Sequence, residues 1–148
     1  MIEFQNYEVR MSKQHLEGIM RDLFKINESL WFVKFQTIPL AYTKNPADFI
    51  VLTPTKRCLV ECKECSTDIF VLSRLSQLTL MKKFEQSHAD NNSYVVVCFY
   101  RRGKKKSMYW VDRISVFDSL IVSGVKRLHV DQLKLLTYEG LEKWVQRL

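Results

Sequence analysis

A tight turn between two short apolar runs constrains the fold of this chain more than any other feature. The runs are residues 49–52 and 57–63, and the turn between them is TPTK, residues 53–56. Proline presets its own φ and hydroxyl side chains bond nearby backbone groups, so this sequence favours a reversal of the chain. We therefore predict an antiparallel hairpin in which Leu52 pairs with Arg57.

This hairpin brings two acids together. Counting outward from its turn places Asp48 directly opposite Glu61, where Cβ atoms lie roughly 4.5–5.5 Å apart and carboxylates repel unless a cation joins them. Mg²⁺ is commonly held by one or two carboxylates, with water and phosphate oxygens completing its shell. Strand periodicity adds Lys63 to the same face, one pleat beyond Glu61. Two acids, a metal and a lysine can supply what phosphodiester hydrolysis needs.

The alternative is that these charged residues line a solvated face of the hairpin. Asp48 would then be a turn residue at a strand start, with Glu61 and Lys63 pointing into water. However, Ile50 and Leu59 share their face, and apolar residues also occupy the other face. Because charged residues at the end of a hairpin covered on both faces are costly without a purpose, we favour a functional site.

The rest of the chain alternates helical and strand patterns. Apolar spacing predicts a helix at residues 12–26 that begins at Ser12, a helix at 71–88, and a mostly helical tail after Asp112 in which Thr137 caps the last helix, to residue 147. Further strands are predicted at residues 30–38, 93–100 and 107–111. This order predicts a mixed β-sheet flanked by helices, in the α/β (α+β) class. The length of 148 residues suits one domain, residues 1–148.

Composition indicates a polyanionic partner. Lys and Arg outnumber Asp and Glu by 23 to 16, for a formal net charge of +7, which favours nucleic acid over mere solubility. No apolar run approaches the roughly 20 residues that span a bilayer, and the first residues lack a signal peptide's apolar stretch. We therefore expect a cytoplasmic protein that does not bind membranes.

The cysteine pattern favours free thiols over a zinc site. Cys58, Cys62 and Cys65 crowd together, but no second Cys or His pair follows at ligand spacing. A strand would also point Cys62 and Lys63 to opposite faces. In a reducing compartment, thiols packed in or beside strands are the simpler interpretation.

The motif Pro46-Ala47-Asp48 followed by Glu61-Cys62-Lys63 resembles the signature of the PD-(D/E)XK nuclease superfamily, which implies a restriction-endonuclease-like core. More is shared than the motif. The stretch ECKECSTDIFVLSRLSQLTLMKKF and the strand YVVVCFY resemble the recombination protein U family of Holliday junction resolvases. The loose similarity extends to YWVDRISVFDSLIVSGVKRLHVDQL and so covers most of the chain.

The resemblance implies a metal site and its neighbours. Asp48 and Glu61 would ligate Mg²⁺, or Mn²⁺ in its place, with the main-chain carbonyl of Cys62, while Lys63 would orient water or stabilise the transition state. An acid of the first helix often joins such sites, and Glu17 is the candidate, against the alternative of a solvated helix residue. Gln77 matches the family's helical glutamine, against the alternative of an ordinary polar residue. Glu64 would point to the other face and is not expected to be a ligand.

The chain also departs from the resolvase pattern. The family carries a long basic N-terminal arm and a protruding stalk, whereas here the arm is short and residues 37–45 leave little room for a stalk. These departures concern the parts that engage a junction, and they leave the residues of nuclease chemistry in place. The reduced size suggests a compact variant, as a phage or mobile element would encode.

A basic loop is the candidate DNA-binding surface. It carries Arg101, Arg102, Lys104, Lys105 and Lys106 around Gly103, and the turn residues Lys56 and Arg57 are weaker candidates. Phosphate contacts position a protein without reading bases, which suits a nuclease that selects DNA shape. The alternative is a loop kept polar for solubility, and the overall charge favours DNA.

These observations predict a metal-dependent, structure-selective endonuclease that resolves four-way junctions by paired nicks leaving 5′-phosphates. A homodimer is expected, because two opposed strands are cut at positions related by twofold symmetry. The alternatives are another nuclease of the superfamily, of restriction or repair type, or a DNA-binding module without catalysis. An intact set of Asp48, Glu61 and Lys63 counts against the last of these.

Overall fold

The fold is organised around one five-stranded mixed sheet. The computed structural model describes residues 15–36, 45–101 and 106–148. In spatial order the strands are β1 (Trp31–Lys34), β2 (Phe49–Leu52), β3 (Arg57–Cys65), β5 (Asn91–Phe99) and β6 (Met108–Arg113). The central β3 and β5 run parallel, and the other neighbours are antiparallel. The predicted mixed sheet is confirmed.

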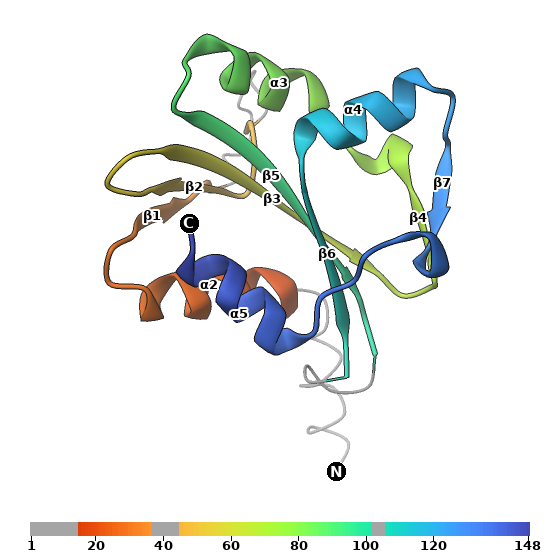
Figure 1. Ribbon diagram of the computed structural model, residues 1–148, viewed down its shortest axis with the longest axis horizontal. Coiled ribbons are helices and arrows are strands. Elements are labelled where there is room, and N and C mark those ends of the chain that lie inside the picture. Colours follow the sequence, from red (N-terminus) through yellow and green to blue (C-terminus); the bar gives the residue numbers. More distant parts are fainter. Residues whose placement is uncertain (1–14, 37–44, 102–105) are drawn as a thin grey trace.

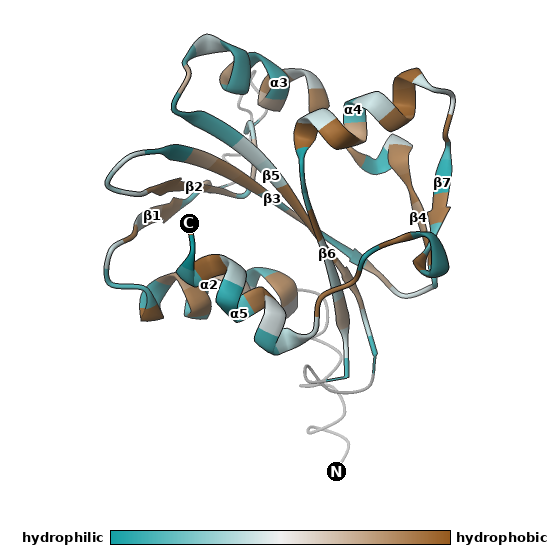
Figure 2. Ribbon diagram, in the orientation of Figure 1, coloured by the Kyte–Doolittle hydropathy of each residue, from teal (hydrophilic) through white to brown (hydrophobic). Residues whose placement is uncertain are grey.

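Helices cover both faces of this sheet. The helices α2 (His15–Ile26) and α5 (Tyr138–Gln146) lie on one face, and α3 (Leu78–Ser87) and α4 (Ile114–Val122) lie on the other (Figure 1). Each face has its own hydrophobic cluster, because alternate strand residues point to opposite sides. Hydrophobic residues run along the middle of β3 and β5 (Figure 2), as expected for strands covered on both faces.

The predicted hairpin is confirmed with its register. Leu52 pairs with Arg57 and Phe49 pairs with Val60, so the next opposed positions are Asp48 and Glu61. The turn is closed by a hydrogen bond from Thr53 N to Lys56 O, at 2.9 Å. β3 extends two residues beyond the prediction because it continues to pair with β5 after β2 has ended.

The helix predicted at residues 71–88 is wrong in its first part. Residue 71 ends a short strand, β4 (Ile69–Val71), which pairs with β7 (Arg127–His129) in a separate two-stranded sheet. A 3₁₀ turn, η1 (Leu72–Arg74), follows, and α3 begins only at Leu78. Apolar residues every three positions fit a 3₁₀ turn as well as an α-helix, and the pairing with β7 is a long-range contact that local spacing does not reveal.

The other predicted elements differ mainly at their ends. The first helix is confirmed over α2, while Ser12 lies outside the described residues. The first strand ends at Lys34, so residues 35 and 36 are not in it and 37–38 are not described. In the tail, β7 and the 3₁₀ turn η2 (Val130–Gln132) interrupt the predicted helical segment. Thr137 caps α5 as predicted, since its hydroxyl accepts a hydrogen bond from Gly140 N at 3.1 Å.

Within the described parts of the chain, no helix is long and apolar enough to cross a membrane.

Candidate active site

Asp48 lies just before β2, where hydrogen bonds to Phe35 and to β3 hold it in place. Its main-chain oxygen accepts a hydrogen bond from Phe35 N at 2.8 Å, just beyond the end of β1. Its carboxylate Oδ2 accepts a hydrogen bond from Cys62 N, also at 2.8 Å, on β3. The side chain therefore reaches across the end of the β2–β3 ladder toward the position opposite it, as the predicted register requires.

Glu61 is the buried acid of this pair. Its side chain shares a sheet face with Leu59, on the side covered by α3 and α4, and only 1% of the residue is exposed. Burial, a hydrogen bond to Asp48 and the negative charge of Asp48 together raise the pKa of Glu61 to about 8, with burial the largest cause. Without a bound cation, the Glu61 carboxyl therefore retains its proton at neutral pH.

Lys63 is the third member of the site. Its Nζ lies 3.4 Å from Glu61 Oε2, and its side chain is 18% exposed. The ammonium lowers the pKa of Glu61, but by less than burial and Asp48 raise it. The ion pair does not satisfy the geometry of a hydrogen bond, so Glu61 Oε2 is a buried oxygen with no hydrogen-bond donor among the described residues. A buried oxygen without a hydrogen bond is costly, so this position favours a further ligand beside the Lys63 ammonium.

The donor set fits a hard divalent cation. Two carboxylates meet at Asp48 and Glu61, and the Cys62 N–H faces Asp48. The N–H and C=O groups of one strand residue point to the same side, so the Cys62 carbonyl faces the same region. Among the described residues no three His, Cys, Asp or Glu side chains converge. A set of two carboxylates and a carbonyl leaves positions for water and phosphate oxygens, as Mg²⁺ prefers.

The cysteines do not form a zinc site. Cys58 and Cys62 belong to the cluster under α2 and α5, whereas Cys65 belongs to the opposite cluster. All four cysteines are free thiols. Burial raises the pKa of Cys58 to about 11 and that of Cys98 to about 12, which keeps both protonated. Neutral thiols divided between two faces are poor zinc ligands.

The contacts that the structure records for Glu17 and Gln77 are not with the acid pair. Glu17 Oε2 forms an ion pair with Lys34 Nζ at 2.6 Å, which ties the start of α2 to the end of β1. Gln77 is the N-cap residue of α3, and its Oε1 accepts a hydrogen bond from the Ser76 hydroxyl. It therefore precedes the helix on which it was predicted. The roles of both residues in catalysis remain predictions.

Two contacts beside the site were not foreseen from the sequence. Glu64 points to the face opposite Lys63, as predicted, and its Oε1 accepts a hydrogen bond from Leu16 N at 3.0 Å, capping the start of α2. Burial raises the pKa of Glu64 despite this bond. Arg74 of η1 donates to the Glu64 main-chain oxygen at 2.8 Å. Both are long-range contacts, and no local pattern could have found them.

The predicted DNA-binding residues are only partly described. Arg101 forms an ion pair with Asp68 and donates to the Tyr100 main-chain oxygen, while Lys106 is exposed. Arg102, Lys104 and Lys105 lie outside the described residues. Lys56 and Arg57 are exposed at the turn of the β2–β3 hairpin, about four residues and thus roughly 13 Å along the strand from Glu61.

Comparison with solved structures finds likenesses of fold, of which one is described here. No known protein family and no curated relative matches the chain by sequence. Among solved structures, the chain is similar to Hjc of Archaeoglobus fulgidus, described as a Holliday junction resolvase from an archaeal hyperthermophile. The identity is 13% and the TM-score 0.48, over 67% of this chain and 77% of that chain. A likeness of this size carries no weight for function, which has to rest on the site itself.

Proposed function

We propose that this chain is a nuclease domain that hydrolyses DNA phosphodiester bonds with Mg²⁺ at Asp48 and Glu61. The observation that carries the proposal is the buried Glu61 carboxylate, opposed by a second acid and left with an oxygen that has no hydrogen-bond donor among the described residues. A structural acid in that position would be better replaced by an apolar residue. A divalent cation would replace the proton that Glu61 otherwise keeps beside Asp48, and it would supply the missing partner.

Each residue has a distinct part in the proposed reaction. Asp48 and Glu61, with the Cys62 carbonyl, would hold the cation. A bound Mg²⁺ supplies charge neutralisation at the phosphoryl oxygens and a more acidic water. Lys63 places its ammonium beside the acids, where it can orient the attacking water or stabilise the charge that develops in the transition state. The strand holds Glu61 and Lys63 on one face, which fixes their relative position before DNA arrives.

A four-way DNA junction is the proposed substrate. The support is the resemblance of the β3 to α3 sequence to recombination protein U resolvases, together with the net charge of +7. Two nicks leaving 5′-phosphates at symmetric positions would require two copies of the site, so we propose that the chain acts as a homodimer. The alternatives are a superfamily nuclease with a linear substrate and a DNA-binding module without catalysis.

Cleavage of a synthetic junction tests the proposal. Labelled four-way junction and matched linear duplex are incubated with the protein in Mg²⁺ or in EDTA. Asp48→Asn removes one ligand charge, and Asp22→Asn, at an exposed position of α2, is the matched control. We expect symmetric nicks on the junction in Mg²⁺ alone, abolished by Asp48→Asn and unchanged by Asp22→Asn.

The other outcomes separate the alternatives. Equal Mg²⁺-dependent cleavage of junction and duplex would overturn the junction assignment and leave a nuclease of another type. Binding of DNA without cleavage in Mg²⁺ or Mn²⁺ would overturn the enzyme assignment. Cleavage that survives Asp48→Asn would show that the chemistry lies elsewhere in the chain.

A further inference from the structure

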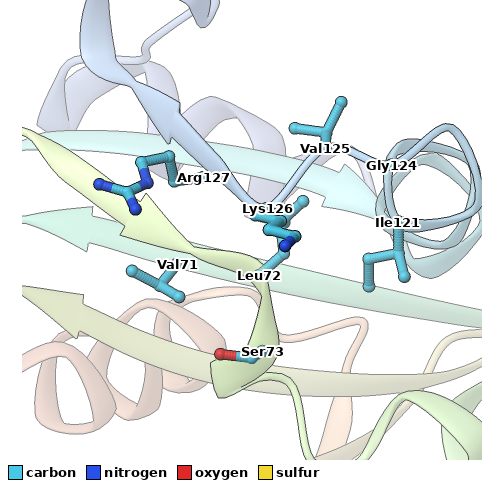
Figure 3. Close-up of a pocket in the computed structure, with 8 residues that line it drawn as sticks. All are labelled: Val71, Leu72, Ser73, Ile121, Gly124, Val125, Lys126 and Arg127. Atoms are coloured by element: carbon cyan, nitrogen blue, oxygen red, sulfur yellow. The ribbon is translucent and has the colours of Figure 1, made fainter.

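A second candidate site lies away from the acid pair, between α4 and the small β4–β7 sheet (Figure 3). We call this cavity, of about 500 Å³, the α4–β7 pocket. Its apolar lining comes from Val71 and Leu72 on one side and from Ile121 and Val125 on the other. No residue of the proposed nuclease site lines it, so its role is independent of the chemistry proposed above.

The walls of this pocket are held in place by backbone hydrogen bonds. Gly124 adopts a left-handed φ of 88° at the end of α4. Gly124 N donates to Ile121 O and Val125 N donates to Leu120 O, both at 3.0 Å, which is the Schellman arrangement of a helix end. On the other wall, Leu72 N donates to Lys126 O at 3.0 Å. The pocket is therefore preformed, as small-ligand and side-chain sites usually are.

Its rim combines exposed apolar side chains with cations. Val71 is 41% exposed, and Val122, beside the pocket in α4, is 79% exposed, the most exposed large hydrophobic residue in the described ranges. Figure 2 shows α4 as largely hydrophobic. Lys126 and Arg127 are exposed, line the pocket (Figure 3), and have no ion pair with any residue that the structure describes. Exposed apolar surface next to unpaired cations is typical of an interaction site.

The chemistry of the lining favours a peptide over a nucleic acid. Unpaired bases bind by stacking on aromatic rings, and no aromatic residue lines this pocket. Aliphatic walls instead suit a leucine, isoleucine or phenylalanine side chain, and the two cations suit carboxylates beside it. We propose that the α4–β7 pocket binds a short acidic segment of a partner protein, with one apolar side chain inserted between α4 and β4.

Titration of defined peptides into ¹⁵N-labelled protein tests this. The probes are heptapeptides of aspartate and glutamate with one central leucine, isoleucine or phenylalanine. Control peptides carry central alanine, or lysine in place of the acids. We expect saturable amide shifts confined to residues 71–73 and 121–127. The double variant Lys126→Ala/Arg127→Ala should weaken binding roughly tenfold or more, whereas Lys25→Ala/Lys143→Ala, on the opposite helical layer, should not.

Specific results would overturn the proposal. These are no saturable binding by any acidic probe, shifts elsewhere on the protein, or equal binding by the lysine-bearing controls. Tighter binding of a single-stranded oligonucleotide to the same amides would make the pocket a DNA contact. Shifts that depend on protein concentration without peptide would assign it to a second copy of the chain. Junction cleavage is also measured with the Lys126→Ala/Arg127→Ala variant. That rate tests the nuclease proposal independently of peptide binding.

Discussion

Replacing Glu61 with glutamine should stabilise the metal-free protein at neutral pH. Glutamine has the shape of a protonated glutamic acid but cannot ionise. The pKa of Glu61 rises from 4.5 to about 8 on folding, chiefly because the side chain is buried. Below pH 4.5 both folded and unfolded chains hold the proton. As the pH rises, the unfolded chain loses it first, so the wild-type free energy of unfolding falls until the pH passes about 8.

The size of this effect follows from the pKa difference. Between the two pKa values the folded chain binds one more proton, so stability falls by about 1.4 kcal/mol per pH unit. From pH 4.5 to pH 7 this amounts to about 3 kcal/mol, which Glu61→Gln should recover. The gain should be near zero at pH 4, should rise with pH, and should level off above about pH 8. Saturating Mg²⁺ should reduce it, because the ligand replaces the proton in wild type and stabilises the folded state.

Urea unfolding followed by tryptophan fluorescence in EDTA, at pH values from 4 to 8, measures this difference. Subtracting the wild-type from the variant free energy at each pH removes contributions from other titrating groups. Glu28→Gln, at an exposed position after α2, controls for the general effect of the substitution. A Glu61→Gln difference that is independent of pH, or that falls with rising pH, would refute the assignment of a buried, protonated acid.

Three further predictions test other parts of the structure. Lys63→Ala should lower junction cleavage by about 100-fold or more while leaving DNA binding intact, as single-turnover rates and gel shifts would show; equal rates would remove Lys63 from the chemistry. Glu64→Ala should lower the free energy of unfolding by about 1–2 kcal/mol, because it removes the acceptor for Leu16 N, while Glu64→Gln retains that acceptor and most of the stability. Equal losses for the two variants in urea unfolding would contradict this. Gly124→Ala should lower the free energy of unfolding by about 1–2 kcal/mol, because a φ of 88° strains a residue with a Cβ even though that Cβ would meet no atom within 4 Å. An unchanged thermal midpoint would contradict this prediction.

The local parts of the site were predictable because one turn fixes them. The TPTK turn sets the register, the register opposes Asp48 to Glu61, and period 2 adds Lys63. Each step uses only neighbouring residues and strand geometry. The structure confirms this register up to Phe49 and Val60.

The parts that could not be predicted depend on long-range contacts. Leu72 and Leu75 are buried and Leu78 is partly buried, as their spacing predicts, but β4 forms just before them by pairing with β7. The ion pair of Glu17 with Lys34 likewise joins α2 to β1. Local periodicity reports which side chains are buried, and it does not report which distant strand or charge will cover them.

Metal binding by the acid pair is the most direct test of the account. Mn²⁺ titrated into the metal-free protein at pH 7, by calorimetry in buffers of different ionisation enthalpy, gives both affinity and proton release. The account predicts one class of site that releases close to one proton per metal, from Glu61, and that is lost in Asp48→Asn and Glu61→Gln. Absence of binding, or binding that both variants retain with no proton release, would contradict the claim that these two acids form a metal site.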